Sequence, residues 1–512
     1  LDAARRSIVL LKNKSHTLPL KKDIGTLAVI GPNADQWQML LGNYNGLPSK
    51  AYTPLEGIRA RLGDAHVIYA QGCELAEGLP TFGKVPAAVL SHGNEKGLRA
   101  DYYDHHDFSG AILFSAIDGQ LDANWGEGAP RKDMNGDDFG VKWNGEITPQ
   151  QTGDYQLGII TTCKVNLYLD DSLVANTSYH FRDEFNDPRL RNSKLLHLEA
   201  GKPHKLRVEA GESYGDARIE LVWSRQGTNR NEELQQEALA AARKADAVVL
   251  CMGLSARLEG EEMDVNIEGF KGGDRTSLDL PKVQENLIRQ VTALGKPVVL
   301  VLLNGSALSV NWEEEHIPAI VEAWYPGEEA GHAISDVLFG DYNPGGRLPV
   351  TFYRSLKDLP DFGDYAMAGR TYRYFKGDVL YPFGYGLSYT TFQYDGLKVQ
   401  QPAHSGDSVF LTVNVKNTGS SEGDEVAQLY VTAKDASVPV PLRSLWGFRR
   451  IHLQPGESRS LHFAVSPDAF TVIDDKMQRV HLTGNYDISV GGGQPGVQRP
   501  SSSNTITTNL HL

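Results

Sequence analysis

Short, continuous apolar runs alternate with amphipathic stretches in two separated parts of the chain. Buried strands are predicted where apolar residues follow one another without interruption, at 26–31, 246–254, 297–303 and 319–324. Helices are predicted where apolar residues recur at helical spacing, at 1–12, 232–245, 283–294 and 328–339. Strands that alternate with helices indicate a mostly parallel sheet that is covered on both faces. We therefore expect one discontinuous α/β sandwich domain over 1–90 and 225–390.

Two other regions show the two-residue period of half-buried strands. Residues 91–224 contain many short runs of this kind, separated by turn residues, and residues 391–512 return to the same pattern. Regularly spaced short strands predict a β-sandwich or barrel. The fold class is therefore multidomain α/β plus all-β, with one β-sandwich inserted into the α/β domain and a second at the C-terminal end.

Composition narrows the range of functions. The chain has 512 residues, of which 40% are hydrophobic, and this length suggests about three modules. Its net charge of −14 without a basic stripe argues against nucleic acid and anionic membranes as partners. No apolar run approaches the length of a membrane span. The three cysteines are far apart, so they predict neither a disulfide framework nor a metal site.

An acidic stretch at 257–280 joins the predicted strand 246–254 to the next helix. It spans more than twenty residues without a helical or strand period, and long connections of this type are usually functional or disordered. Glu259, Glu261 and Glu262 lie at its start, on the edge of the sheet where open α/β folds bind ligands. The cluster suggests acid–base chemistry, and a solvated acidic loop is the alternative.

Longer motifs resemble the C-terminal portion of glycoside hydrolase family 3, the exo-acting β-glucosidases and β-xylosidases. The shared motifs include LEGEEM followed by GGDRTSLDLP, then AWYPGEEAGHAISDVLFGDYNPGGRLPVTFY, GRTYRYF and LYPFGYGLSYTTF. The closing LTVNVKNTGSSEGDEVAQLYV implies a fibronectin type III-like domain, and GLRADYYD opens a stretch that resembles the protective-antigen-type β-sandwich. Family members begin with a TIM-barrel-like domain that carries an aspartate nucleophile. This sequence opens where that barrel would end, so we expect this chain alone to be inactive.

The resemblance also implies roles for individual residues. Retaining glycoside hydrolysis uses one carboxyl group as nucleophile and a second as acid and then base. The family places this acid/base on the acidic stretch in a Glu-x-Glu or Glu-Gly context, which Glu261 matches best, Glu259 second and Glu262 third. Asp274 and Arg275 are expected to brace the loop or to orient the acid through charge-assisted hydrogen bonds, and a surface ion pair is the alternative. Arg275 is also a candidate for substrate binding. Trp324 and Tyr325 end a predicted strand, where they could line a sugar site or pack in the core.

The implied substrates are terminal non-reducing β-D-glucosyl or β-D-xylosyl residues of oligosaccharides or aryl β-glycosides. The implied partner is the missing barrel, as a domain or a second chain, with a homodimer possible and a periplasmic or secreted location. If the inserted sandwich stands beside the entrance, it should limit glycan length. A non-catalytic carbohydrate-binding protein is the alternative function, whereas a serine hydrolase is disfavoured because no G-x-S-x-G motif is present.

Overall fold

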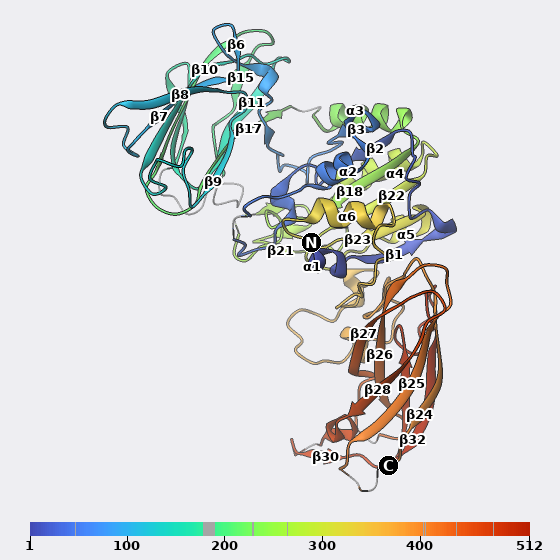
Figure 1. Ribbon diagram of the computed structural model, residues 1–512. Helices are drawn as coiled ribbons and strands as arrows, with labels where there is room; N and C mark the ends of the chain where they lie inside the picture. Colours follow the sequence, from blue (N-terminus) through green and yellow to red (C-terminus); the bar gives the residue numbers. More distant parts are fainter. Residues whose placement is uncertain are drawn as a thin grey trace.

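The protein consists of three units in the computed structural model, which describes residues 1–46, 48–177, 190–227, 230–263, 265–402, 404, 406–436, 438–474 and 476–512. Figure 1 shows an α/β unit in the middle, a β-rich unit at upper left and a second β-rich unit below. The upper unit enters the chain between β3 and α3 of the α/β unit. Within the described ranges, no helix combines the length and apolar character that crossing a membrane requires.

A six-stranded sheet forms the centre of the α/β unit. Its strand order is β1 (Val9–Asn13), β23 (Ala319–Glu322), β22 (Val298–Leu303), β18 (Ala247–Gly253), β2 (Leu27–Ile30) and β3 (Val67–Ala70). β1 is antiparallel to β23, and the other neighbours are parallel. This is the mostly parallel sheet that the uninterrupted apolar runs predict.

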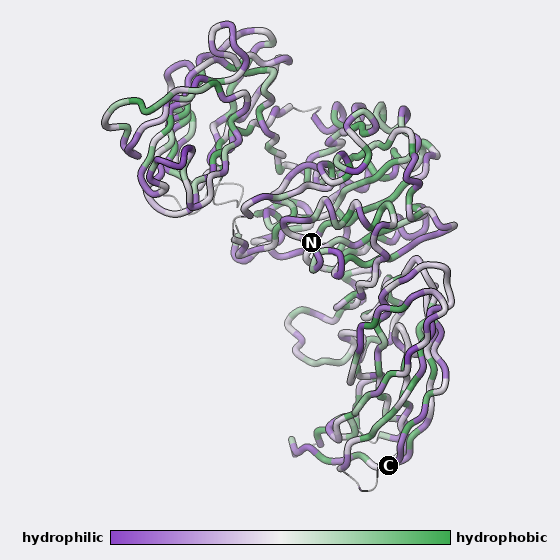
Figure 2. The backbone as a smooth tube through the Cα atoms, viewed as in Figure 1, coloured by the Kyte–Doolittle hydropathy of each residue, from purple (hydrophilic) through white to green (hydrophobic). Residues whose placement is uncertain are grey.

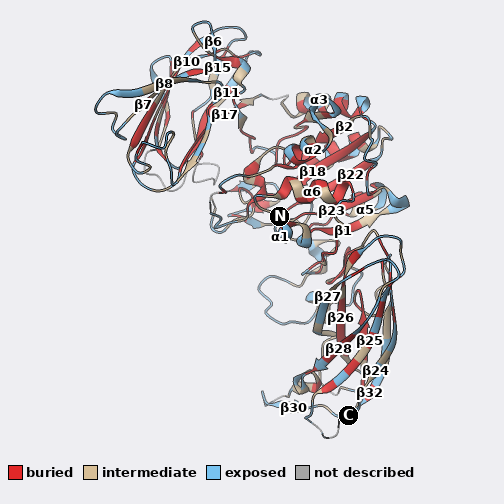
Figure 3. Ribbon diagram, in the orientation of Figure 1, coloured by how far each residue is buried: buried red, intermediate tan, exposed pale blue. Residues whose placement is uncertain are grey.

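Helices cover both faces of this sheet. One face carries α3 (Arg230–Lys244), α4 (Lys282–Thr292) and α5 (Asn311–His316), and the other carries α1 (Asp2–Ser7), α2 (Pro54–Leu62) and α6 (Ala330–Leu338). Along β22, alternate residues enter the two hydrophobic layers, so that Leu300 packs on one side and Val301 on the other. Every residue of β22 is buried, which explains its continuous apolar sequence. Figures 2 and 3 show this apolar, buried centre.

The structure corrects two expectations about local structure. Residues 1–12 do not form one helix, because α1 ends at Ser7 and β1 begins at Val9. Val9 and Leu10 enter opposite hydrophobic layers, which a strand between two helix layers allows and a helix on one face does not. The acidic stretch also contains regular structure, a small antiparallel sheet of β19 (Asn266–Ile267), β20 (Phe270–Lys271) and β21 (Asp274–Arg275).

The upper unit is a sandwich of two antiparallel sheets. One contains β5 (Leu90–His92), β6 (Glu95–Lys96), β7 (Leu98–Tyr103), β8 (Ile112–Asp118), β10 (Phe139–Ile147), β12 (Lys164–Leu169), β13 (Ser172–Asn176) and β16 (His204–Glu212). The other contains β4 (Gly83–Lys84), β9 (Asp122–Gly126), β11 (Gly153–Thr161), β14 (Leu190–Asn192), β15 (Leu196–Leu198) and β17 (Ala217–Gln226). β4 pairs with β17, and the domain boundaries at 91 and 224 stay a prediction.

The lower unit is also a β-sandwich. One sheet consists of β24 (Phe392–Val399), β25 (Val409–Asn417) and β28 (Ser458–Val465). The other consists of β27 (Ser444–Leu453), β26 (Gly423–Ala433), β31 (Asn485–Gly491) and β32 (Thr505–His511). Their facing residues form one hydrophobic core, as the two-residue period predicts.

Candidate functional site

Hydrogen bonds from buried amide side chains hold the backbone where the acidic stretch begins, at the carboxyl end of β18. Gln284, fully buried on α4, accepts a hydrogen bond from Gly253 N and donates to Gly253 O, both at 2.8 Å. Its amide also donates to Leu75 O at 2.7 Å. On the other side, Asn33 Nδ2 donates to Leu254 O at 2.8 Å. These buried amides satisfy backbone groups that the end of the strand leaves unpaired, and they fix the direction in which the loop starts.

Glu259 ties the loop to the two neighbouring strands. Its Oε1 accepts hydrogen bonds from Gly305 N at 2.7 Å and from the Tyr325 hydroxyl at 2.6 Å, and its Oε2 accepts one from the Ser306 hydroxyl. Gly305 and Ser306 follow β22, and Tyr325 follows β23. A Cβ at Gly305 would lie 2.8 Å from the Tyr325 ring and 3.0 Å from Glu259 Oε1, so the close approach requires glycine. Both carboxylate oxygens of Glu259 are thus occupied inside the chain.

Arg275 braces the same corner from β21. Its Nη1 donates to Ser306 Oγ at 2.9 Å and to Ala307 O at 2.7 Å, and its Nη2 donates to Asp279 O at 3.2 Å. Burial lowers the pKa of Arg275, and the Glu259 carboxylate opposes that effect. Burial together with the charge of Glu259 raises the pKa of Tyr325 well above its usual range, so its hydroxyl remains a donor. Asp274, in contrast, is exposed.

Glu322 stabilises the turn that follows β23 and precedes Tyr325. This carboxyl group at the end of β23 is fully buried, and it accepts hydrogen bonds from Trp324 N at 3.0 Å and Asn304 Nδ2 at 3.2 Å. Burial raises its pKa well above the usual range, and the Glu259 charge adds to the shift. Trp324 has a left-handed φ of 62°, which is uncommon for a bulky residue. Its ring packs edge-on against Phe352, and its Nε1 donates to Ser7 O at 3.2 Å.

Glu261 and Glu262 differ from Glu259 because both are exposed. The Tyr44 hydroxyl donates to Glu261 Oε2, and Asn43 Nδ2 donates to the backbone oxygen of Glu259 at 3.0 Å. Glu262 has a left-handed φ of 49°. The structure thus brings one glutamate into an internal network and leaves its neighbours at the surface of the loop.

The sequence reasoning missed several residues of this network. Asn43, Tyr44, Ser306 and Glu322 were not among the candidates, although each contacts the loop or the residues that hold it. The only sequence signals are the Gly/Asn-rich turn around Tyr44 and the Asn-Gly pair that ends the strand before Ser306. In the part of the chain that the structure describes, no group of three or more His, Cys, Asp or Glu side chains is arranged to hold a metal ion.

The sequence matches two protein-family models and several known proteins. The family model described as the glycosyl hydrolase family 3 C-terminal domain matches residues 8–389, and a fibronectin type III-like domain model matches 425–494. The xylan 1,4-beta-xylosidase of Xylanibacter ruminicola is 36% identical over 506 residues, which cover 96% of this chain and 56% of that protein. The protein of Aspergillus oryzae named probable beta-glucosidase I is 30% identical, over 98% of this chain and 62% of its own.

A solved structure shows the same arrangement of units. The crystal structure of the β-glucosidase from Kluyveromyces marxianus superposes with a TM-score of 0.71 at 29% identity, over 99% of this chain and 62% of that one. The same enzyme has also been solved in complex with glucose. The chain therefore spans between 56% and 62% of the length of these relatives.

Proposed function

Because this chain belongs to glycoside hydrolase family 3, we propose that it supplies the general acid/base glutamate of a retaining exo-β-glycosidase. The nucleophilic aspartate lies on a barrel domain outside this chain. The substrates are terminal non-reducing β-D-xylosyl or β-D-glucosyl residues of oligosaccharides or aryl glycosides. A relative named as a xylan 1,4-beta-xylosidase and another named as a probable beta-glucosidase support this pair of sugars.

The choice of Glu261 as the acid/base rests on one observation, the difference between the surroundings of the Glu259 and Glu261 carboxyl groups. Both oxygens of Glu259 accept hydrogen bonds from groups at the ends of the neighbouring strands, which leaves them poorly placed to meet a sugar. Glu261 lies two residues further along the same braced loop, and its carboxyl group is exposed. A residue that must exchange protons with a substrate needs both a fixed backbone and an accessible carboxyl group. Glu261 meets both requirements.

The reaction then follows the retaining mechanism. Protonated Glu261 gives its proton to the oxygen of the leaving group while the partner aspartate attacks the anomeric carbon. Ionised Glu261 next takes a proton from the water that hydrolyses the glycosyl-enzyme, so it ends the cycle protonated again. The two carboxyl groups work about 5 Å apart, and two carboxyl groups suffice without a metal or cofactor. A relative from Salmonella typhimurium named as a periplasmic beta-glucosidase supports a periplasmic or secreted location.

The experiment compares this chain alone with the same chain supplied with the barrel domain, on aryl β-xyloside and aryl β-glucoside. We expect turnover only in the presence of the barrel. Glu261→Gln should lower kcat by about 10²-fold or more, with sugar binding retained, whereas the matched control Glu262→Gln should stay close to wild type. Turnover by the isolated chain, or full activity of Glu261→Gln, would refute the proposal. Sugar binding without any hydrolysis would favour the non-catalytic alternative.

A further inference from the structure

The inserted sandwich shares a buried core with the α/β unit. Ile160, Leu190 and Val222 of the sandwich belong to the same hydrophobic cluster as Trp37 and Leu40 of the α/β unit. A shared core of this kind resists movement, unlike a connection through linkers alone. The insert is therefore held in a defined orientation on the α/β unit.

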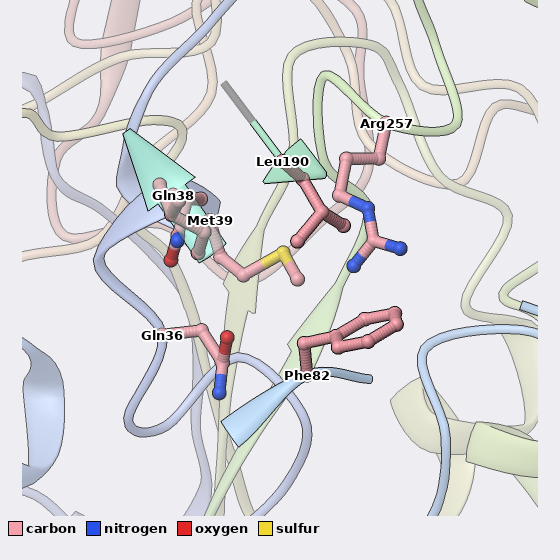
Figure 4. A pocket seen from close by; sticks show the side chains of 7 residues that line it. Gln36, Gln38, Met39, Phe82, Leu190 and Arg257 are labelled. Carbon is pink, nitrogen blue, oxygen red and sulfur yellow. The ribbon is translucent and has the colours of Figure 1, made fainter. Parts of the chain in front are cut away.

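This junction reaches the beginning of the acidic stretch. Figure 4 shows Met39, Phe82, Leu190 and Arg257 around a small cavity between the two units. Arg257 is buried and donates from Nη2 to Pro80 O at 3.2 Å. Because Arg257 precedes Glu259 by two residues, the insert packs against the first residues of the loop that carries the carboxyl cluster.

The insert also holds both ends of the segment 37–49. At one end, Trp37 Nε1 donates to Glu220 Oε2 at 3.0 Å, and the Arg218 guanidinium lies 4.2 Å from the centre of the Trp37 ring. At the other end, Asn124 Nδ2 donates to Ser49 O at 3.0 Å. Arg218, Glu220 and Asn124 all belong to strands of the inserted sandwich, β17 and β9.

Between Trp37 and Ser49, the residues Asn43 and Tyr44 contact the acidic loop. Asn43 Nδ2 donates to Glu259 O at 3.0 Å, and the Tyr44 hydroxyl donates to Glu261 Oε2. Tyr44 adopts a left-handed φ of 56°, which is uncommon for a tyrosine, and its side chain reaches Glu261 from an exposed position, with 86% of its surface accessible. The hydrogen bond and the charge of Glu261 raise the pKa of Tyr44, so the phenol remains a donor.

We propose that the inserted sandwich orients the acid/base residue, with Tyr44 as the positioning residue through which it acts on Glu261. The inference rests on the proposed function and adds a task for the insert that differs from limiting the size of the substrate. An insert that only narrows the entrance would affect KM and the preferred glycan length. An insert that orients Glu261 affects kcat.

The first test needs only this chain and measures hydrogen–deuterium exchange in peptides that cover 257–263. Trp37→Phe removes the donor to Glu220, and Asn124→Ala removes the donor to Ser49 O, so both should increase exchange in these peptides. Tyr214→Phe is the matched control, because Tyr214 is an exposed tyrosine of the insert with 89% of its surface accessible. Unchanged exchange in 257–263 for both variants would overturn the proposed coupling.

The second test measures kcat and KM of the complete enzyme, barrel included. Tyr44→Phe should lower kcat about tenfold and leave KM within about twofold, since it removes an orienting contact rather than substrate binding. Asn124→Ala should act in the same direction more weakly, and Tyr214→Phe should match wild type.

Wild-type kcat in Tyr44→Phe, or a raised KM with unchanged kcat, would refute the positioning role. Failure of the proposed function is a separate outcome, because it shows as full activity in Glu261→Gln. The exchange experiment does not depend on activity, so it tests the coupling between the insert and the acidic loop even if the proposed function is wrong.

Discussion

Tyr325 donates its hydroxyl hydrogen to Glu259 Oε1 over 2.6 Å, and this contact joins the end of β23 to the loop that leaves β18. The strand between them, β22, contributes Gly305 N and the Ser306 hydroxyl to the same carboxylate. Three adjacent parallel strands therefore converge on one side chain at their carboxyl ends. These hydrogen bonds fix the loop at Glu259, two residues before Glu261.

Removal of the Glu259 carboxylate should destabilise this corner. Glu259→Ala leaves the Tyr325 hydroxyl, Gly305 N and the Ser306 hydroxyl without their acceptor, and we expect a cost of about 2–4 kcal/mol. Thermal unfolding followed by calorimetry measures the effect, as a lower Tm of the α/β unit. Glu262→Ala is the matched control and should change the Tm little, because Glu262 is exposed. Equal shifts in the two variants would contradict the structural role of Glu259.

Glu322 should make the folded protein less stable as pH rises. Burial raises its pKa in the folded state, so the folded protein keeps a proton that the unfolded chain releases above the ordinary pKa of glutamate. Its contribution to stability is therefore lost as pH rises from that ordinary value toward the raised pKa. Glu322→Gln keeps the shape and carries no titratable proton. Its Tm relative to wild type should rise between pH 5 and pH 8, and a constant difference would show that Glu322 does not titrate in this way.

The α/β unit and the C-terminal sandwich are joined by a buried ion pair. Arg347 Nη2 lies 2.9 Å from Glu425 Oε2, and the exposed fractions of the two side chains are 7% and 0%. Arg347→Ala should destabilise the protein by about 3–5 kcal/mol, because it leaves the buried Glu425 carboxylate without its counterion.

Limited proteolysis between the two units measures this effect, as faster cleavage of the variant. Arg347→Ala combined with Glu425→Gln should recover part of the loss, since no buried charge then remains. Arg6→Ala breaks an exposed pair with Asp2 and should leave cleavage unchanged. A double variant that is cleaved faster than Arg347→Ala would argue against the charge explanation.

Much of the fold can be predicted from the sequence, because apolar residues recur clearly at helical spacing in some segments and at the two-residue spacing of strands in others. The buried strands β18 and β22 each correspond to an uninterrupted apolar run, and α4 begins at Lys282, next to the predicted start at 283. The helix predicted over 1–12 was wrong beyond Ser7, because a short apolar run such as Val9 to Leu11 fits a strand or a helix equally well. Its pairing with β23, more than three hundred residues away, decides the outcome.

The site was predicted only in part. The carboxyl cluster stands out in the sequence, but nothing local separates Glu259 from Glu261. The difference comes from partners far along the chain, since Tyr325 reaches Glu259 across 66 residues and Tyr44 reaches Glu261 across 217. Side chains that meet only through the order of strands in the sheet leave no pattern in neighbouring residues.

The most direct measurement is azide rescue of Glu261→Ala in the complete enzyme, on an aryl β-glycoside whose leaving group needs no protonation. Without the base, the glycosyl-enzyme should accumulate, and azide should attack it without deprotonation. The account predicts that azide restores turnover and yields a glycosyl azide of retained β-configuration. Glu259→Ala and Glu262→Ala should show no rescue. Absence of rescue in Glu261→Ala, or rescue in Glu262→Ala, would contradict the assignment of Glu261 as acid/base.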